Sequence, residues 1–187
     1  MPLLLVAVLS VAGLAACSHD DGPKVLVIGD SLTFGCQLQG LGKHGPGTWT
    51  IDAVIGRRTE AGILAATEHH PEGFDQVIIA LGTNDYYLSE QAFSGRIDKM
   101  MEVIGPDVPV TWVNVDTGTT HLAPATEGVN PALAAAPGRH PSLKVADWDA
   151  FINARADVDS LRAGDGIHYN TDGYDVRTQW MESLVPT

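Results

Sequence analysis

Basic residues are scarce in this sequence: 11 Lys and Arg stand against 23 Asp and Glu, a formal net charge of −12 at pH 7. This balance disfavours nucleic acids and anionic membrane surfaces as partners, because both carry negative charge. Only two cysteines are present, and no apolar run reaches the ~20 residues of a membrane-spanning helix. With 44% apolar and 18% charged residues, the 187-residue chain is otherwise typical of one globular domain with a sizeable core.

The longest apolar stretch, MPLLLVAVLSVAGLAAC, opens the sequence and is followed by a polar segment. It is too short for a spanning helix and fits the apolar region of a signal peptide, although no Lys or Arg precedes it. Its last four residues, LAAC, resemble a bacterial lipobox, in which the cysteine is acylated. We therefore expect a lipoprotein-type signal over 1–17 with Cys17 lipidated, and a linker over 18–23. The alternative is a buried N-terminal helix.

This signal predicts a location in the bacterial cell envelope outside the cytoplasm, with the protein either lipid-anchored or secreted. Contact with a membrane is then expected only through the N-terminal anchor. Lipidation of Cys17 leaves Cys36 without a partner for an intramolecular disulfide. We expect Cys36 to be a small buried helix residue rather than a reactive thiol.

From residue 24 onward, apolar runs alternate with segments of helical periodicity, which indicates one domain over 24–187. Strands are expected over 25–28, 49–55, 74–81, 108–115 and 143–146. Helices are expected from the first strand to about residue 38 and over 58–70, 93–104, 130–136 and 171–184. The runs VLVI and VIIAL are continuous rather than alternating, as in strands that are covered on both faces. The order of elements predicts an α/β fold with a parallel five-stranded sheet and a loop-rich segment over 116–141.

Two polar segments, GDS at 29–31 and GTND at 82–85, directly follow predicted strands. In an open parallel sheet the ligand site lies at the carboxyl ends of the strands, so these segments are expected to meet. Ser31 at a helix start can cap free backbone N–H groups. The same position also suits an exposed nucleophile beside unpaired N–H donors.

A serine nucleophile needs a base, an acid that orients the base, and donors for an oxyanion. The segment DGIH places Asp165 three residues before His168, so that one local loop can bring the carboxylate to the imidazole. The backbone N–H of Ser31, the side chain of Asn84 and the backbone N–H of Gly56 are the candidate oxyanion donors.

These four motifs, in this order, resemble the blocks of the SGNH (GDSL-type) hydrolases, and the resemblance covers about residues 24–184. It implies a flavodoxin-like three-layer α/β/α sandwich and a serine esterase that forms an acyl-enzyme, with no metal and no organic cofactor. The expected substrates are small acyl esters, acetyl esters in particular, or acylated carbohydrates. Ser31, His168 and Asp165 would be catalytic, and Ser31, Gly56 and Asn84 would form the oxyanion hole.

One block departs from the family pattern, since Val54 stands two residues before Gly56 where the family usually has asparagine. That block and the later WVNVD and VADW runs look more like SGNH domains of extracytoplasmic O-acetyltransferases. A transferase that moves acetyl groups to or from a cell-wall glycan, supplied by a separate membrane protein, is therefore the first alternative. A non-catalytic glycan-binding lipoprotein is the second.

Other polar residues have weaker signals. Tyr86 and Tyr87 follow Asn84 and could line a sugar or acyl pocket, with ordinary packing as the alternative. Asp116 ends a predicted strand and is a possible substrate contact like Tyr86, with turn formation as the alternative. His69 and His70 occupy adjacent helix positions without metal-ligand spacing, and we expect them to face solvent. The GLGKHG segment at 40–45 follows a helix and does not open one, which argues against a dinucleotide-binding turn.

Overall fold

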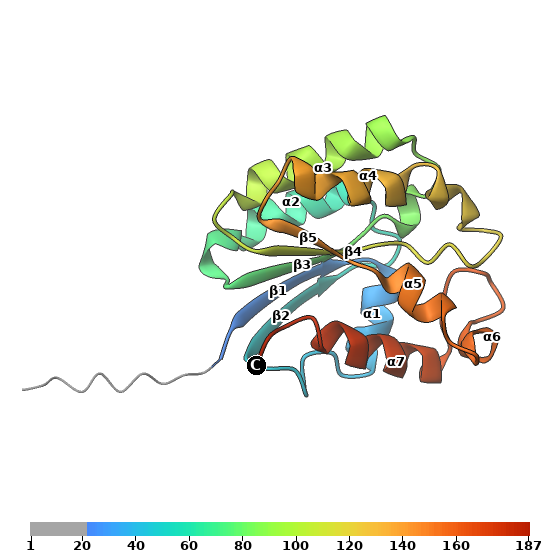
Figure 1. Ribbon diagram of the computed structural model, residues 1–187. Coiled ribbons are helices and arrows are strands. Elements are labelled where there is room, and N and C mark those ends of the chain that lie inside the picture. The colour runs from blue at the N-terminus through green and yellow to red at the C-terminus, as the bar shows by residue number, and fades with distance from the viewer. Residues whose placement is uncertain (1–21) are drawn as a thin grey trace, which may run out of the picture.

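The computed structural model describes residues 22–187, and its centre is a sheet of five parallel strands in the order β2-β1-β3-β4-β5 (Figure 1). The strands are β1 Lys24–Gly29, β2 Thr48–Ala53, β3 Gln76–Ala80, β4 Val110–Val113 and β5 Leu143–Ala146. The α-helices are α1 Ser31–Leu38, α2 Thr59–His69, α3 Glu90–Ile104, α4 Val129–Ala135, α5 Trp148–Asn153, α6 Val158–Leu161 and α7 Thr171–Glu182. Short 3₁₀ turns are η1 Pro71–Gly73, η2 Thr83–Asp85, η3 Ala123–Thr126 and η4 Ala136–Gly138.

Helices cover both faces of this sheet, which gives three layers. Figure 1 shows α2, α3 and α4 above the sheet and α1 and α7 below it, with α5 and α6 beyond the ends of the strands. Each face has its own apolar core: Leu26 and Ile28 of β1 point into one, and Val25 and Val27 point into the other. This alternation explains the continuous VLVI run, because both sets of side chains are completely buried. The predicted α/β sandwich with a five-stranded parallel sheet is confirmed.

Strand β1 lies in the middle of the sheet and fixes the position of the loops that follow it and its neighbours. It pairs in parallel with β2 and with β3, so that Gly29 lies beside Ala53 on one side and Ala80 on the other. The loops after these three strands therefore leave the sheet at one edge. The connections from β1 and β3 diverge there, as they do at the ligand site of flavodoxin-like sheets.

Two short helices between β5 and α7 were not predicted. Helix α5 has a local signal, because the Asp147 side chain accepts the N–H of Ala150 and caps its first turn. The apolar Trp148 and Ile152, four residues apart, bury its inner face. Helix α6 has four residues and no side-chain cap, so its sequence carries little local signal.

The expected lipoprotein-type signal, with Cys17 as its predicted lipidation site, and most of the predicted linker lie outside the described residues. Within residues 22–187, no helix is long and apolar enough to cross a membrane. In the same range, no group of His, Cys, Asp and Glu side chains is arranged to hold a metal ion. Of the two adjacent histidines, His70 is exposed as expected, whereas His69 is half-buried, with its Nε2 3.0 Å from the Asp52 carboxylate.

Candidate active site

Ser31 is the first residue of α1, and one residue, Asp30, separates it from the end of β1. The preceding Asp30 is the N-cap of α1, and its Oδ1 accepts the N–H of Leu32 at 2.9 Å. The capping role that the sequence offered to Ser31 is thus filled by Asp30. Because Ser31 opens the helix, its backbone N–H has no acceptor within α1. Its hydroxyl and its N–H are therefore both free for other partners.

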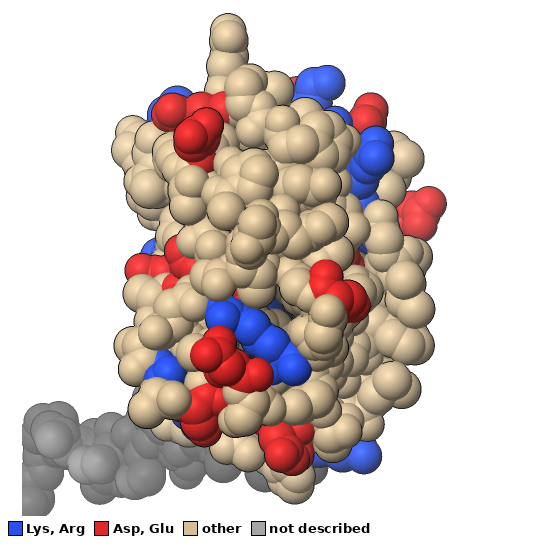
Figure 2. All heavy atoms as spheres, turned by 90° about the vertical axis from the view of Figure 1, so that its right-hand side faces the viewer, with Lys and Arg blue, Asp and Glu red and all other residues tan. Residues whose placement is uncertain are grey.

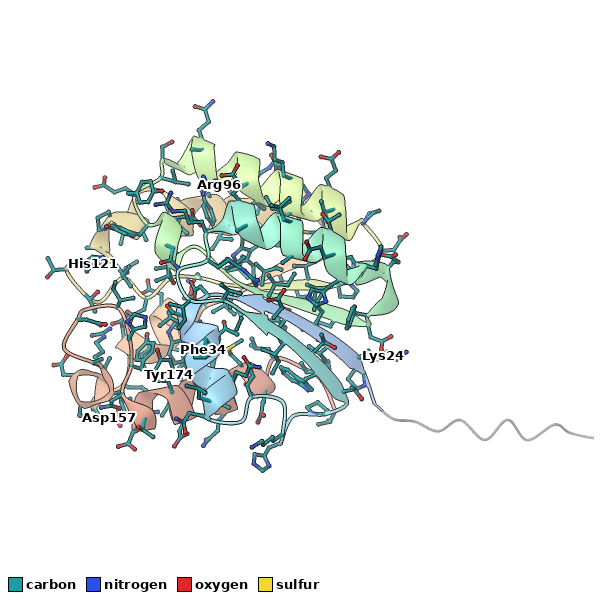
Figure 3. The ribbon with its side chains drawn as sticks, turned by 180° about the vertical axis from the view of Figure 1, so that it is seen from behind. Lys24, Phe34, Arg96, His121, Asp157 and Tyr174 are labelled. Carbon is teal, nitrogen blue, oxygen red and sulfur yellow. The ribbon has the colours of Figure 1, made fainter. Side chains whose placement is uncertain are left out.

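The hydroxyl of Ser31 contacts His168, whose Nε2 lies 2.9 Å from Oγ. These two residues are 137 positions apart in the chain. The loop of His168 precedes α7 and returns over the end of β1, which explains how residues from opposite ends of the domain meet. Figure 3, from behind, shows α1 with Phe34 in front of α7, which carries Tyr174, and the two helices are in contact.

Asp165 holds the other side of the His168 ring. Its Oδ2 lies 2.6 Å from Nδ1 of His168, while Oδ1 accepts the backbone N–H groups of Ile167 and His168, each at 2.9 Å. Gly166 between them has φ 73°, a left-handed conformation that glycine adopts without strain and that closes this tight loop. The backbone N–H of His168, followed by its ring, holds the pKa of Asp165 well below its usual range.

This geometry selects one tautomer of the neutral imidazole. With a carboxylate beside Nδ1, the proton resides on Nδ1, and Nε2 presents its lone pair to the Ser31 hydroxyl. The sequence-predicted Ser31, His168 and Asp165 therefore form one unbroken hydrogen-bonded chain. Such a chain can remove the hydroxyl proton while the carboxylate stabilises the resulting imidazolium.

Asn84 lies in the η2 turn after β3, on the far side of the opening between β1 and β3. Its Nδ2 donates to the carbonyl oxygen of Arg57 at 3.1 Å and makes a longer contact, 3.4 Å, with Oδ2 of Asp30. The first bond orients the amide. The second is weak enough for a developing oxyanion to replace it.

Gly56 follows β2 and lies at the tip of a turn closed by the N–H of Arg57, which donates to the carbonyl oxygen of Val54. Its φ of 75° is one that glycine adopts readily, and no atom lies within 4 Å of the position of a Cβ. Within residues 22–187, the N–H of Gly56 donates to no protein acceptor. It is therefore available as an oxyanion donor.

Arg57 anchors this turn, and the sequence did not single it out. Its guanidinium donates to the carbonyl oxygens of Asp52 and Gly29 and pairs with the Asp52 carboxylate at 2.7 Å. The contact with Gly29 links the Gly56 turn to the corner that carries Ser31. Burial would raise the pKa of Asp52, but hydrogen bonds from Arg57 and His69 outweigh it and lower that pKa.

The aspartate of the GTND motif has a structural role. Asp85 is fully buried, and its carboxylate accepts both the N–H and the hydroxyl of Thr59, at 2.7 and 2.6 Å. Its other oxygen pairs with Arg96 of α3. These bonds fix the loop of Asn84 to the first turn of α2, which directly follows the Gly56 turn.

Asp116 does not lie open to a substrate, contrary to one of the two predicted possibilities. Its carboxylate is 3% exposed and accepts bonds from Arg162 at 2.9 Å, Tyr169 at 2.7 Å, Asn153 at 3.0 Å and the N–H of Gly118 at 2.9 Å. Burial alone would raise its pKa, but these donors outweigh burial and lower it. All its acceptor positions are filled, so Asp116 supports the 116–122 loop.

Cys36 is completely buried in α1, as expected, and burial raises the pKa of its thiol. Tyr86, the other possible substrate contact, is half-buried at the end of η2 beside Asn84. A groove of about 710 Å³ lies between the Gly56 turn and α2, and its apolar Ile55 and Leu64 are 68% and 65% exposed. No residue of the Ser31–His168–Asp165 chain lines it.

Figure 2 faces the edge of the sheet where these loops meet. The middle of this face is mostly neither acidic nor basic, and the basic side chains visible in its lower half are set among acidic ones. The site therefore shows no broad basic surface of the kind that binds polyanions.

The sequence matches no protein-family model and no curated protein. Among solved structures, the chain is similar to a lipase/acylhydrolase from Enterococcus faecalis, with 20% identity over 86% of this chain and 94% of that chain and a TM-score of 0.68. A putative lipolytic protein of the G-D-S-L family from Desulfitobacterium hafniense has 18% identity, coverage of 87% and 99%, and a TM-score of 0.68.

A third similar structure is the C-terminal catalytic domain of peptidoglycan O-acetyltransferase A from Streptococcus pneumoniae. It has 14% identity over 87% of this chain and 91% of that chain, with a TM-score of 0.67. All three similarities extend over nearly the same share of the chain as the resemblance carried by the four motifs. The resemblance is thereby confirmed: the chain has the fold of the SGNH, or GDSL-type, hydrolases.

Proposed function

We propose that this chain is a serine esterase of the SGNH type that cleaves short acyl esters, acetyl esters in particular. The observation that carries the proposal is the hydrogen-bonded chain from Ser31 through His168 to Asp165, at 2.9 and 2.6 Å. A helix cap would need none of these contacts, and Asp30 already caps α1. The arrangement therefore has a chemical use that packing alone does not explain.

In the proposed first step, Oγ of Ser31 attacks the ester carbonyl carbon while Nε2 of His168 takes the hydroxyl proton. The carbonyl oxygen becomes an oxyanion, which accepts hydrogen bonds from the N–H groups of Ser31 and Gly56 and from Nδ2 of Asn84. As the tetrahedral intermediate collapses, the alcohol leaves with the proton from His168. Water then attacks the acyl-enzyme by the same route, releasing the carboxylic acid and restoring the Ser31 hydroxyl.

No metal or organic cofactor takes part in these steps, because nucleophile, base and oxyanion donors are all groups of the chain itself. The preference for acetyl esters is supported by the similarity to an O-acetyltransferase catalytic domain. The negative net charge also favours uncharged substrates over anionic ones.

The same similarity favours a second candidate, an O-acyltransferase. In that reaction a sugar hydroxyl of a cell-wall glycan replaces water as the group that attacks the acyl-enzyme. An acyl-supplying membrane protein would be its partner. The two candidates share the acyl-enzyme and differ only in what resolves it.

The lipobox-like LAAC segment supports an envelope location with Cys17 as the lipid anchor. Mass spectrometry of protein extracted from membranes tests this part. A diacylglyceryl mass on a peptide that begins at Cys17 is expected, whereas an unmodified peptide spanning residue 17 would contradict it.

The test of the esterase uses the full-length chain and its Ser31→Ala variant with p-nitrophenyl acetate, with and without chitotriose. Serine-dependent release of acetate that is unaffected by the sugar supports the esterase. Acetylated chitotriose among the products supports the transferase. Equal rates in the two proteins would contradict both, and a chain that binds chitotriose without turnover would be a glycan-binding lipoprotein.

A further inference from the structure

Three ring side chains form a continuous row at the edge of the sheet, and we call Tyr86, Tyr87 and His121 the aromatic ledge. The ring centroids of Tyr86 and His121 are 5.0 Å apart, and those of Tyr86 and Tyr87 are 5.6 Å apart with perpendicular planes. The guanidinium of Arg58 lies over the Tyr87 ring at 5.5 Å. Figure 3 shows His121 at the end of the molecule opposite Lys24, where β1 begins.

The ledge joins the two loops that carry Asn84 and His168. Tyr86 follows Asn84 by two residues at the end of η2. At the other end, a Cβ on Gly166 would lie 3.5 Å from Cβ of His121. The hydroxyl of Thr119, two residues before His121, donates to the carbonyl oxygen of Gly166 at 2.6 Å. The ledge therefore borders the space in which Ser31 would hold an ester.

The ledge also has unused hydrogen-bonding groups. Tyr87 is 51% exposed, His121 is exposed and Tyr86 is half-buried. Within the part of the chain that the structure describes, neither the two tyrosine hydroxyls nor the ring nitrogens of His121 bond to another protein group. The buried Tyr169 differs, since its hydroxyl bonds to both Asp116 and Trp148. The ledge rings thus combine apolar faces with free polar edges.

We propose that the aromatic ledge binds the alcohol part of the ester, and that this alcohol is a sugar ring. The inference rests on the proposed esterase or transferase function, because it names the substrate of that same site. A sugar ring packs its C–H groups against aromatic faces and bonds its hydroxyls to the tyrosine hydroxyls and the imidazole. A long alkyl alcohol would cover these polar groups without replacing their bonds to water, which is unfavourable.

The test compares two acetyl esters that differ only in the alcohol: chitotriose carrying O-acetyl groups, and ethyl acetate. In the full-length chain, Tyr87→Ala and His121→Ala are each expected to lower kcat/KM for the sugar ester about tenfold, mainly through KM. Tyr87→Phe, which keeps the ring and removes the hydroxyl, should lose less than Tyr87→Ala. All three variants should retain activity on ethyl acetate within twofold. Leu64→Ala, an exposed substitution in the groove beside α2, is the matched control and should leave both activities unchanged.

Equal losses of kcat/KM on both esters would overturn the ledge proposal. Such losses would indicate a general effect on folding or catalysis, which does not distinguish between the two alcohols. Unchanged activity on the sugar ester would overturn the proposal as well. Calorimetric titration of Ser31→Ala with chitotriose separates the two proposals, since it requires no turnover. One outcome is that wild type cleaves no ester, that Ser31→Ala binds chitotriose, and that adding Tyr87→Ala to it abolishes binding. This outcome would support the ledge proposal and contradict the esterase proposal. If ester cleavage depends on Ser31 but Tyr87→Ala does not weaken chitotriose binding, only the ledge proposal is contradicted.

Discussion

Asp30 offers a sharp test of the electrostatics at the Ser31 corner. Its side chain is 1% exposed, and burial raises its pKa from 3.8 to about 6 against the opposing effects of the Leu32 N–H and the Arg177 charge. The folded protein therefore holds this proton more tightly than the unfolded chain does. The contribution of Asp30 to stability is full below about pH 4 and is lost as the pH rises through 6.

The size of the effect follows from the two pKa values. At about 1.4 kcal/mol per pKa unit, the difference between 3.8 and about 6 corresponds to about 3 kcal/mol of unfolding free energy. Asp30→Asn removes the charge and keeps an Oδ1 that can accept the Leu32 N–H. The variant should match wild type near pH 4 and exceed its stability at pH 8 by up to about 3 kcal/mol.

Urea denaturation of both proteins at pH 4, 6 and 8 measures this difference. Asp147→Asn is the matched control, because Asp147 caps α5 in the same way but is exposed to solvent. The control should follow the wild-type pH dependence. Parallel curves for wild type and Asp30→Asn between pH 4 and 8 would refute the account of a buried, poorly solvated carboxylate. Lower stability of Asp30→Asn at pH 8 would refute it too.

Three further outcomes are expected. Asp165→Asn should lower kcat for p-nitrophenyl acetate by about 10²-fold or more with little change in KM, because the carboxylate that stabilises imidazolium at His168 is lost; steady-state kinetics decide this. Asp116→Ala should cost about 3 kcal/mol in urea denaturation and leave KM unchanged, since it removes the buried carboxylate that pairs with the largely buried Arg162; a raised KM at full stability would instead restore Asp116 as a substrate contact. Cys36 should react with a thiol reagent only after unfolding, because its thiol is buried and its pKa is raised; fast labelling of the native protein would contradict this.

The sequence alone predicted the sheet and the meeting of the two loops that carry Ser31 and Asn84, where Nδ2 of Asn84 lies 3.4 Å from Oδ2 of Asp30. Continuous apolar runs mark strands that are buried on two faces, which identifies the sheet. Parallel strands end at the same edge of a sheet, which brings the loops after them together. Asp165 and His168 were predictable because their contact is local, three residues apart. That this loop reaches Ser31 rested on the family resemblance, since no local pattern relates positions 137 residues apart.

The residue roles that could not be predicted from the sequence depend on contacts between distant loops. Asp116 follows a strand just as Asn84 does, and only the approach of Arg162, 46 residues later, separates a buried support from a free carboxylate. Arg57 has no motif, and its role comes from the pairing of β2 with β1, which brings Asp52 and Gly29 within its reach. His121 lies in a loop without periodicity, and its neighbours Tyr86 and Gly166 come from other parts of the chain.

The most direct test of the central claim is the mass of the protein after reaction with a fluorophosphonate. The Ser31 oxygen should displace fluoride and carry one phosphonyl group, located by peptide mapping to the segment that contains residue 31. The account predicts labelling of wild type at a rate at least tenfold above that of His168→Ala, and no labelling of Ser31→Ala. Labelling that persists in Ser31→Ala, or an unlabelled wild type, would contradict the claim that Ser31 is an activated nucleophile.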